Sequence, residues 1–124
     1  MHRRTILLAD DQPHMRALLM ASLAPMGARV LSAGSGEEAL ALAAGTPSDL
    51  LLIDFEMSGL TGVQTVRQLK AMPAYAELPV IMITGRGQKR IRGEAAEGGI
   101  TFVIHKPFSP AELLETVEGI FAKP

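Results

Sequence analysis

Short, mostly apolar runs separated by helix-like segments are the feature of this sequence that most constrains its fold. Five such runs of four or five residues lie at 6–9, 29–33, 50–53, 80–83 and 100–104. Runs of this length without polar alternation are typical of strands that are buried on both faces of a parallel sheet. Because parallel neighbours need a long crossover connection, usually a helix, the pattern predicts an α/β fold.

The segments between the apolar runs carry helix-start and helix-stop residues. Ser35 and Ser109 are expected N-caps, and Glu38 and Glu112 stand three residues later, where they would complete capping boxes. Pro110 suits the first position of the last helix. The five helices are expected at about 13–26, 36–45, 62–72, 87–97 and 110–122.

Alternating strands and helices predict a doubly wound, five-stranded parallel sheet with five helices. Right-handed crossovers favour the flavodoxin-like strand order 2-1-3-4-5. The sequence contains no repeat and no linker-like stretch, so we expect a single domain over residues 1–124.

Composition and charge exclude several classes of protein. The absence of cysteine rules out disulfides, thiolate chemistry and Cys-based metal sites. A net charge of −1 argues against direct nucleic-acid binding. The apolar stretches are far shorter than the roughly 20 residues of a membrane span, and the N-terminal residues do not resemble a signal peptide. We therefore expect a soluble cytoplasmic protein that does not insert into membranes.

Polar residues stand at the end of four of the five expected strands. Asp10 and Asp11 follow the first, Asp54 the third, Thr84 the fourth and Lys106 the fifth. In doubly wound sheets these ends form one ligand-binding edge. Clustered carboxylates repel one another unless a cation compensates, and Mg²⁺ is the most plausible hard ion. One carboxylate could then attack an activated phosphorus, while the hydroxyl and the ammonium group bind the phosphoryl oxygens.

This constellation resembles the receiver domain of two-component response regulators, the CheY-like family. The resemblance covers the whole chain and rests on five positions in the family's order, with Lys106 followed by Pro107 and Phe108. It implies that Asp54 is the phosphoacceptor. A partner histidine kinase or histidine phosphotransfer protein would supply the phosphoryl group.

The resemblance also implies a metal site. Asp11, Asp54 and the backbone carbonyl of Glu56 would bind Mg²⁺, and Asp10 would help through a water molecule. Such a protein is a phosphoacceptor that assists its own phosphorylation and dephosphorylation, and it is not an enzyme in the usual sense.

Further family features concern the switch that follows phosphorylation. Thr84 would move toward the phosphate and Lys106 would pair with it, while the Lys106–Pro107 bond would be cis. The signal would pass to a downstream protein target, and we expect a monomer or a weak dimer.

Two positions depart from the family pattern. Ser58 stands where the family usually has proline, which should loosen that turn. Val103 stands where the family usually has Tyr or Phe as a switch residue, and Phe102 lies one residue earlier. Because alternate strand residues face opposite sides, either the aromatic switch is absent or a local slip lets Phe102 replace it. We favour absence.

The basic segment Arg86–Arg92 follows the fourth strand. We favour a solvated, poorly formed helix here, and the alternative is a mobile basic surface that orders on phosphorylation or docks an acidic partner. A second hypothesis pairs Glu56 with Arg86 across the mouth of the site, where the two charges would slow attack by water on the phosphoryl group.

Three other functions are alternatives to a phosphoaccepting receiver domain. A haloacid-dehalogenase-type phosphatase also uses a strand-end aspartate, but it has Asp-x-Asp where this chain has Asp54-Phe55-Glu56. A flavodoxin-like FMN carrier would need a phosphate-binding loop where Asp10 and Asp11 stand. A phosphorylation-independent interaction module would not need the complete acidic set.

Overall fold

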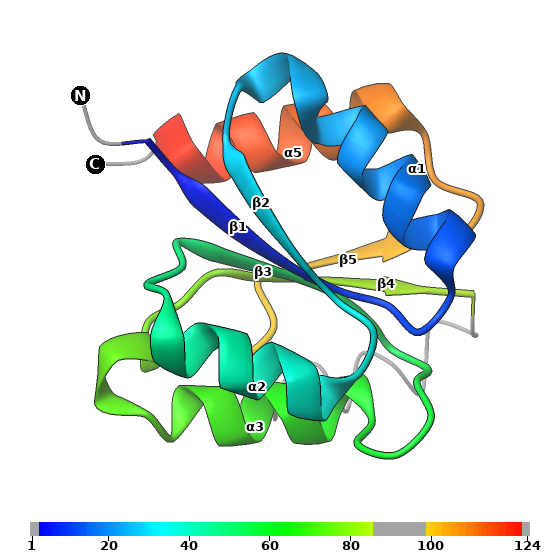
Figure 1. Ribbon diagram of the computed structural model, residues 1–124. Coiled ribbons are helices and arrows are strands. Elements are labelled where there is room, and N and C mark those ends of the chain that lie inside the picture. Colours follow the sequence, from blue (N-terminus) through cyan, green and yellow to red (C-terminus); the bar gives the residue numbers. More distant parts are fainter. Residues whose placement is uncertain (1–2, 86–98, 123–124) are drawn as a thin grey trace.

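A five-stranded parallel sheet forms the centre of the protein, in the order β2-β1-β3-β4-β5. The structure is a computed structural model that describes residues 3–85 and 99–122 (Figure 1). The strands are β1 (Thr5–Ala9), β2 (Arg29–Ala33), β3 (Leu50–Asp54), β4 (Val80–Thr84) and β5 (Phe102–His105). The predicted fold class and strand order are therefore confirmed.

Helices cover both faces of the sheet. They are α1 (Pro13–Leu23), α2 (Gly36–Gly45), α3 (Gly62–Lys70) and α5 (Pro110–Ala122), with short 3₁₀ turns η1 (Ala24–Met26) and η2 (Pro73–Tyr75). Helices α1 and α5 lie on one face, and α2 and α3 lie on the other (Figure 1). The helix predicted near residues 87–97 falls outside the described residues, so four of the five predicted helices are seen.

Strand alternation divides the core into two apolar layers. In β3, Leu51 and Ile53 belong to the layer beneath α2 and α3, whereas Leu50 and Leu52 belong to the layer beneath α1 and α5. Every residue of β1, β3 and β4 is buried, because each of these strands has a strand neighbour on both sides and helices above and below. Their carboxyl ends are thereby held in fixed positions.

The helix caps differ in part from the prediction. Ser35 caps α2 as expected, since its Oγ accepts a hydrogen bond from the amide of Glu38 at 3.1 Å. The carboxylate of Glu38, however, accepts from the amide of Gly34 and not from that of Ser35. A complete capping box occurs instead on α3, between Thr61 and Gln64. The Thr-x-x-Gln pattern that signals it was present in the sequence.

Three element boundaries lie two or three residues from their predicted positions. α1, predicted to run to about residue 26, ends at Leu23, and the 3₁₀ turn η1 follows it. β5 begins at Phe102, and Thr101 just before it bonds to Val80 twice: its amide donates to the Val80 carbonyl at 2.8 Å, and its Oγ1 accepts from the Val80 amide at 3.0 Å. α3 ends at Lys70 because Pro73 holds the preceding Met72 in an extended conformation. Among the described helices, none is both long and apolar enough to cross a membrane.

Candidate functional site

Backbone hydrogen bonds between strands bring the predicted site residues to one edge of the sheet. The amide of Lys106 donates to the carbonyl of Thr84 at 2.8 Å, which joins the ends of β5 and β4. The amide of Phe55 donates to the carbonyl of Ile83 at 2.8 Å, which joins the ends of β3 and β4. The positions of Asp54, Thr84 and Lys106 are therefore set by the sheet itself.

The three predicted carboxylates form a cluster. Asp10, Asp11 and Asp54 each offer one oxygen, and these oxygens all lie within 4.8 Å of one another. Asp10 is fully buried, Asp54 is 4% exposed and Asp11 is half-buried. Such a cluster of oxygen ligands suits a hard divalent cation.

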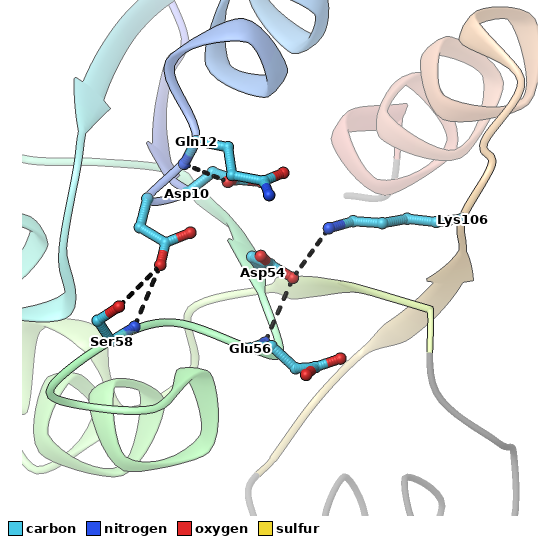
Figure 2. Close-up of polar contacts among 7 residues, drawn as sticks. Asp10, Gln12, Asp54, Glu56, Ser58 and Lys106 are labelled. Carbon is cyan, nitrogen blue, oxygen red and sulfur yellow. Dashed lines mark hydrogen bonds and ion pairs between the residues drawn. The ribbon is translucent and has the colours of Figure 1, made fainter.

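Asp10 provides an independent sign that a cation fits this site. Its Oδ1 accepts a hydrogen bond from the amide of Gln12 at 2.9 Å (Figure 2), but its buried Oδ2 has no hydrogen-bond partner among the described residues. Burial raises the pKa of Asp10, and the nearby charge of Asp11 raises it further, against the lowering effects of the Gln12 amide, Lys106 and Arg16. A buried acceptor without a donor costs free energy, and a bound cation or its water shell would remove that cost.

Asp54 is held at one of its two carboxylate oxygens. Oδ1 accepts from Nζ of Lys106 at 3.3 Å and from the amide of Glu56 at 3.3 Å (Figure 2). Burial raises the pKa of Asp54 most, and the charge of Asp10 adds to this, while Lys106 opposes both effects. Lys106 is 28% exposed, so it reaches Asp54 from the solvent side of the site.

A contact at Asp11 was not predicted from the sequence. Its Oδ2 accepts two hydrogen bonds from Ser58, one from the amide at 3.2 Å and one from Oγ at 3.3 Å. Ser58 lies in the loop between β3 and α3, far from Asp11 in the sequence. The departure of Ser58 from the family's proline is the one sequence signal at this position, and by itself it predicts only a looser turn.

Gly62 is a second residue whose role was missed. It begins α3, and a Cβ atom added there would lie 2.5 Å from the backbone oxygen of Asp54. Its amide also donates to the carbonyl of Phe55 at 3.3 Å. Glycine therefore lets α3 pack directly against the end of β3.

The remaining predicted residues are placed as follows. Thr84 is fully buried at the end of β4, and the Lys106–Pro107 bond is cis, as predicted. The side chain of Glu56 is exposed, and its carbonyl stays a predicted metal ligand. The segment Arg86–Arg92, and with it the predicted pairing of Glu56 with Arg86, lies outside the described residues.

The register of the β4–β5 ladder shows whether Phe102 can replace the aromatic switch residue that is missing at position 103. The ladder runs without a slip, with Ile81 opposite Phe102 and Met82 opposite Val103. Val103 packs against the core layer beneath α2 and α3, whereas the side chain of Phe102 is 46% exposed. Phe102 therefore does not take the place of an aromatic residue at position 103, which agrees with the favoured interpretation.

A comparison with protein families matches residues 6–118 to the response regulator receiver domain. The chain belongs to this family. It is thus a receiver domain of the kind found in two-component response regulators. The three carboxylates and Lys106 lie at the edge of the sheet where the sequence placed them.

Individual relatives and solved structures agree with this assignment. The chemotaxis protein CheY of Pseudomonas aeruginosa is 32% identical over 119 residues, which are 95% of this chain and 96% of that protein. The phosphate regulon transcriptional regulatory protein PhoB of the same organism is 30% identical over 120 residues, 97% of this chain but 52% of PhoB. The chain thus spans about half the length of several curated relatives that it matches.

Among solved structures, the fold is similar to that of the chemotaxis protein CheY4 of Vibrio cholerae. The TM-score is 0.91 at 28% identity, over 96% of this chain and 99% of that one. A putative response regulator from Chloroflexus aurantiacus also has a TM-score of 0.91, at 30% identity, over 98% and 100% of the two chains.

Proposed function

We propose that this receiver domain accepts a phosphoryl group on Asp54 in a Mg²⁺-dependent reaction and so switches an interaction surface. The observation that carries the proposal is the environment of Asp54. Its carboxylate is buried at the edge of the sheet, its Oδ1 lies 3.3 Å from the ammonium group of Lys106, and two further carboxylates lie beside it. This is a nucleophile with cationic and metal-binding groups around it.

The geometry supports attack by Oδ2 of Asp54. Both described hydrogen bonds to this carboxylate end on Oδ1, so Oδ2 is the oxygen left for a phosphorus atom or a cation. In the proposed transfer a new bond forms between the aspartate oxygen and phosphorus. The phosphorus–nitrogen bond of a phosphohistidine donor breaks, and the imidazole nitrogen leaves with the bonding electron pair.

The donor set fits Mg²⁺, which prefers oxygen ligands and keeps several water molecules. Asp11, Asp54 and the backbone carbonyl of Glu56 would hold the ion, and Asp10 would act through water. When bound, the ion neutralises the charge that builds up on the phosphoryl oxygens. Oδ2 of Asp10, which is buried and has no hydrogen-bond partner in the described part of the chain, is the feature of the site that most favours a cation.

Lys106 and Thr84 have electrostatic and hydrogen-bonding roles in this proposal. The ammonium group of Lys106 exchanges its contact with Asp54 for one with a phosphoryl oxygen, and the hydroxyl of Thr84 donates to another. The protein itself is the phosphorylated product, so it acts as a phosphoacceptor that assists its own reaction. A histidine kinase or a histidine phosphotransfer protein supplies the group, and a downstream protein reads the phosphorylated surface.

Mass spectrometry after incubation with acetyl phosphate and Mg²⁺ tests the proposal. A single phosphoryl adduct of about 80 Da should form, and it should be lost in Asp54→Asn and when Mg²⁺ is chelated. Asp49→Asn is the matched control, because Asp49 lies at the opposite end of the sheet, where its Oδ2 accepts from the amide of Thr5 at 2.8 Å. An adduct that survives in Asp54→Asn contradicts the proposal, as does repeated hydrolysis of phosphomonoesters without an adduct.

A further inference from the structure

Ser58 makes an unusual contact with the outermost carboxylate of the site. It lies four residues after Asp54 in the sequence, and it donates both its amide and its hydroxyl to the same oxygen, Oδ2 of Asp11. The two dashed lines that end at Ser58 in Figure 2 mark these bonds. They connect the loop after β1 with the loop after β3 across the mouth of the carboxylate cluster.

The contact depends on the type of residue at position 58. Proline, which the family pattern favours here, has neither an amide hydrogen nor a hydroxyl group, so it could form neither bond. Alanine would keep only the amide donor. Serine and threonine are the residues that combine a backbone donor with a short hydroxyl-bearing side chain.

The electrostatics of the cluster explain what this contact does. Asp10 and Asp54 are held within the sheet and largely buried, whereas Asp11 is half-buried at the edge. Without a cation the three carboxylates repel one another, and Asp11 is the one that can rotate outward into water. Two donors on Oδ2 oppose that rotation. Oδ1 of Asp11 accepts no hydrogen bond from the described residues, so it stays available to a cation.

We propose that Ser58 is a positioning residue that pre-orients Asp11 for the divalent cation, so that the metal-free protein already holds its cation ligand in place. A ligand that is ordered beforehand loses less conformational entropy when the ion binds. The inference rests on the proposed function, since it takes the carboxylate cluster to be a Mg²⁺ site. It goes beyond that function because it says that Ser58, which is not one of the five family positions, strengthens the binding of Mg²⁺.

Mg²⁺ titration of ¹⁵N-labelled protein, followed by NMR chemical shifts, measures the effect directly and without phosphorylation. Ser58→Ala should weaken Mg²⁺ binding by about threefold to tenfold, the range expected for one exposed hydrogen bond to a charged group. Ser58→Thr keeps the hydroxyl and should bind Mg²⁺ about as tightly as the parent. Ser22→Ala is the matched control, because it removes a serine hydroxyl that donates within α1 to the carbonyl of Leu18.

A second measurement separates positioning from damage to the site. Phosphorylation of Ser58→Ala by acetyl phosphate should be slower than that of the parent at low Mg²⁺ and should recover at saturating Mg²⁺. Unchanged or tighter Mg²⁺ binding by Ser58→Ala overturns the inference, as does a phosphorylation defect that saturating Mg²⁺ does not correct. If the parent binds Mg²⁺ and forms the adduct, and Ser58→Ala does both equally well, the inference about Ser58 is contradicted but the proposed function is not. A parent that binds no Mg²⁺ overturns the proposed function as well.

Discussion

Nζ of Lys106 lies 3.3 Å from Oδ1 of Asp54, although Asp54 ends β3, Lys106 follows β5, and β4 separates these two strands in the sheet. The ion pair links β5 to β3 across the end of the intervening strand. It counteracts the burial and the charge of Asp10, both of which raise the pKa of Asp54. Lys106 thus helps to keep the proposed nucleophile ionised.

Replacing Lys106 with methionine should slow phosphorylation of Asp54 by acetyl phosphate by about tenfold to a hundredfold. The variant loses a cationic group near the phosphoryl oxygens and raises the pKa of Asp54 further. The rate of adduct formation, measured by mass spectrometry at saturating Mg²⁺, checks this. Lys70→Met is the control, because Lys70 ends α3 and packs against Gly99 at the other end of the sheet. Equal rates for the parent and Lys106→Met would refute the assigned role.

Asp10→Asn should stabilise the metal-free protein by about 1 kcal/mol, because it removes a buried charge from a cluster of carboxylates. The amide oxygen of asparagine can still accept the hydrogen bond from Gln12 that Oδ1 of Asp10 accepts now. The same variant should gain less stability from Mg²⁺ than the parent does. Urea unfolding with and without Mg²⁺ measures both effects. Destabilisation of the metal-free variant would show that Asp10 is better compensated than the described contacts indicate.

The stability of the metal-free protein should depend on pH in a defined direction. Because the pKa values of Asp10 and Asp54 are raised in the folded state above the usual 3.8, the native protein takes up protons more readily than the unfolded chain. The stability gained from protonating these two carboxyl groups is fully present below pH 3.8, and it is lost as the pH rises through their raised pKa values. Lowering the pH from 7 toward 4 should therefore reduce the unfavourable contribution of these two groups to stability.

Mg²⁺ should reverse this trend, because the ion binds the ionised carboxylates and is displaced by protons. The stability that saturating Mg²⁺ adds should therefore shrink as pH falls from 7 to 4. Unfolding curves at both pH values, for the parent and for Asp10→Asn/Asp54→Asn, separate the two contributions. A Mg²⁺ effect of equal size at both pH values, or in the double variant, would speak against ligation by these carboxylates.

Gly62→Ala should destabilise the protein by about 2–4 kcal/mol, because the new Cβ would overlap the backbone oxygen of Asp54 and force α3 away from β3. Gly119→Ala in α5 is the matched control, since a Cβ there would meet no atom of residues 3–85 or 99–122 within 4 Å. That substitution should stabilise the helix by about 0.5–1 kcal/mol. Denaturant midpoints of the two variants should consequently move in opposite directions, and a harmless Gly62→Ala would contradict the close packing.

Phosphorylation of Gly62→Ala offers a further check on the link between packing and chemistry. Displacement of α3 would shift the loop that carries Glu56 and Ser58, so adduct formation should slow even under conditions in which the variant is folded. Gly119→Ala should react at the rate of the parent. Equal rates for both variants would show that the position of α3 does not influence the site.

Much of this protein could be predicted because local patterns and the topology agree. Uninterrupted apolar runs such as 50–53 can be buried only between two layers of helices, and right-handed crossovers then limit the order of the strands. The same topology places every strand-end residue at one edge. Asp10, Asp54 and Lys106 could therefore be grouped from the sequence alone, although they are far apart in it.

Contacts within that edge could not be predicted in the same way. The pairing of Glu38 with the amide of Gly34, the donation of Ser58 to Asp11 and the packing of Gly62 on Asp54 each depend on distances of a few ångströms. Such distances depend on how the loops pack against the sheet, and the spacing of residues in the sequence does not predict them. Residue patterns alone were enough to predict which groups meet, because strand order follows from hydrophobic burial and chirality. Packing and hydrogen-bond geometry in the folded protein set the finer contacts: which oxygen of Asp54 faces Lys106, which oxygen of Asp10 has no partner among the described residues, and which residue holds Asp11.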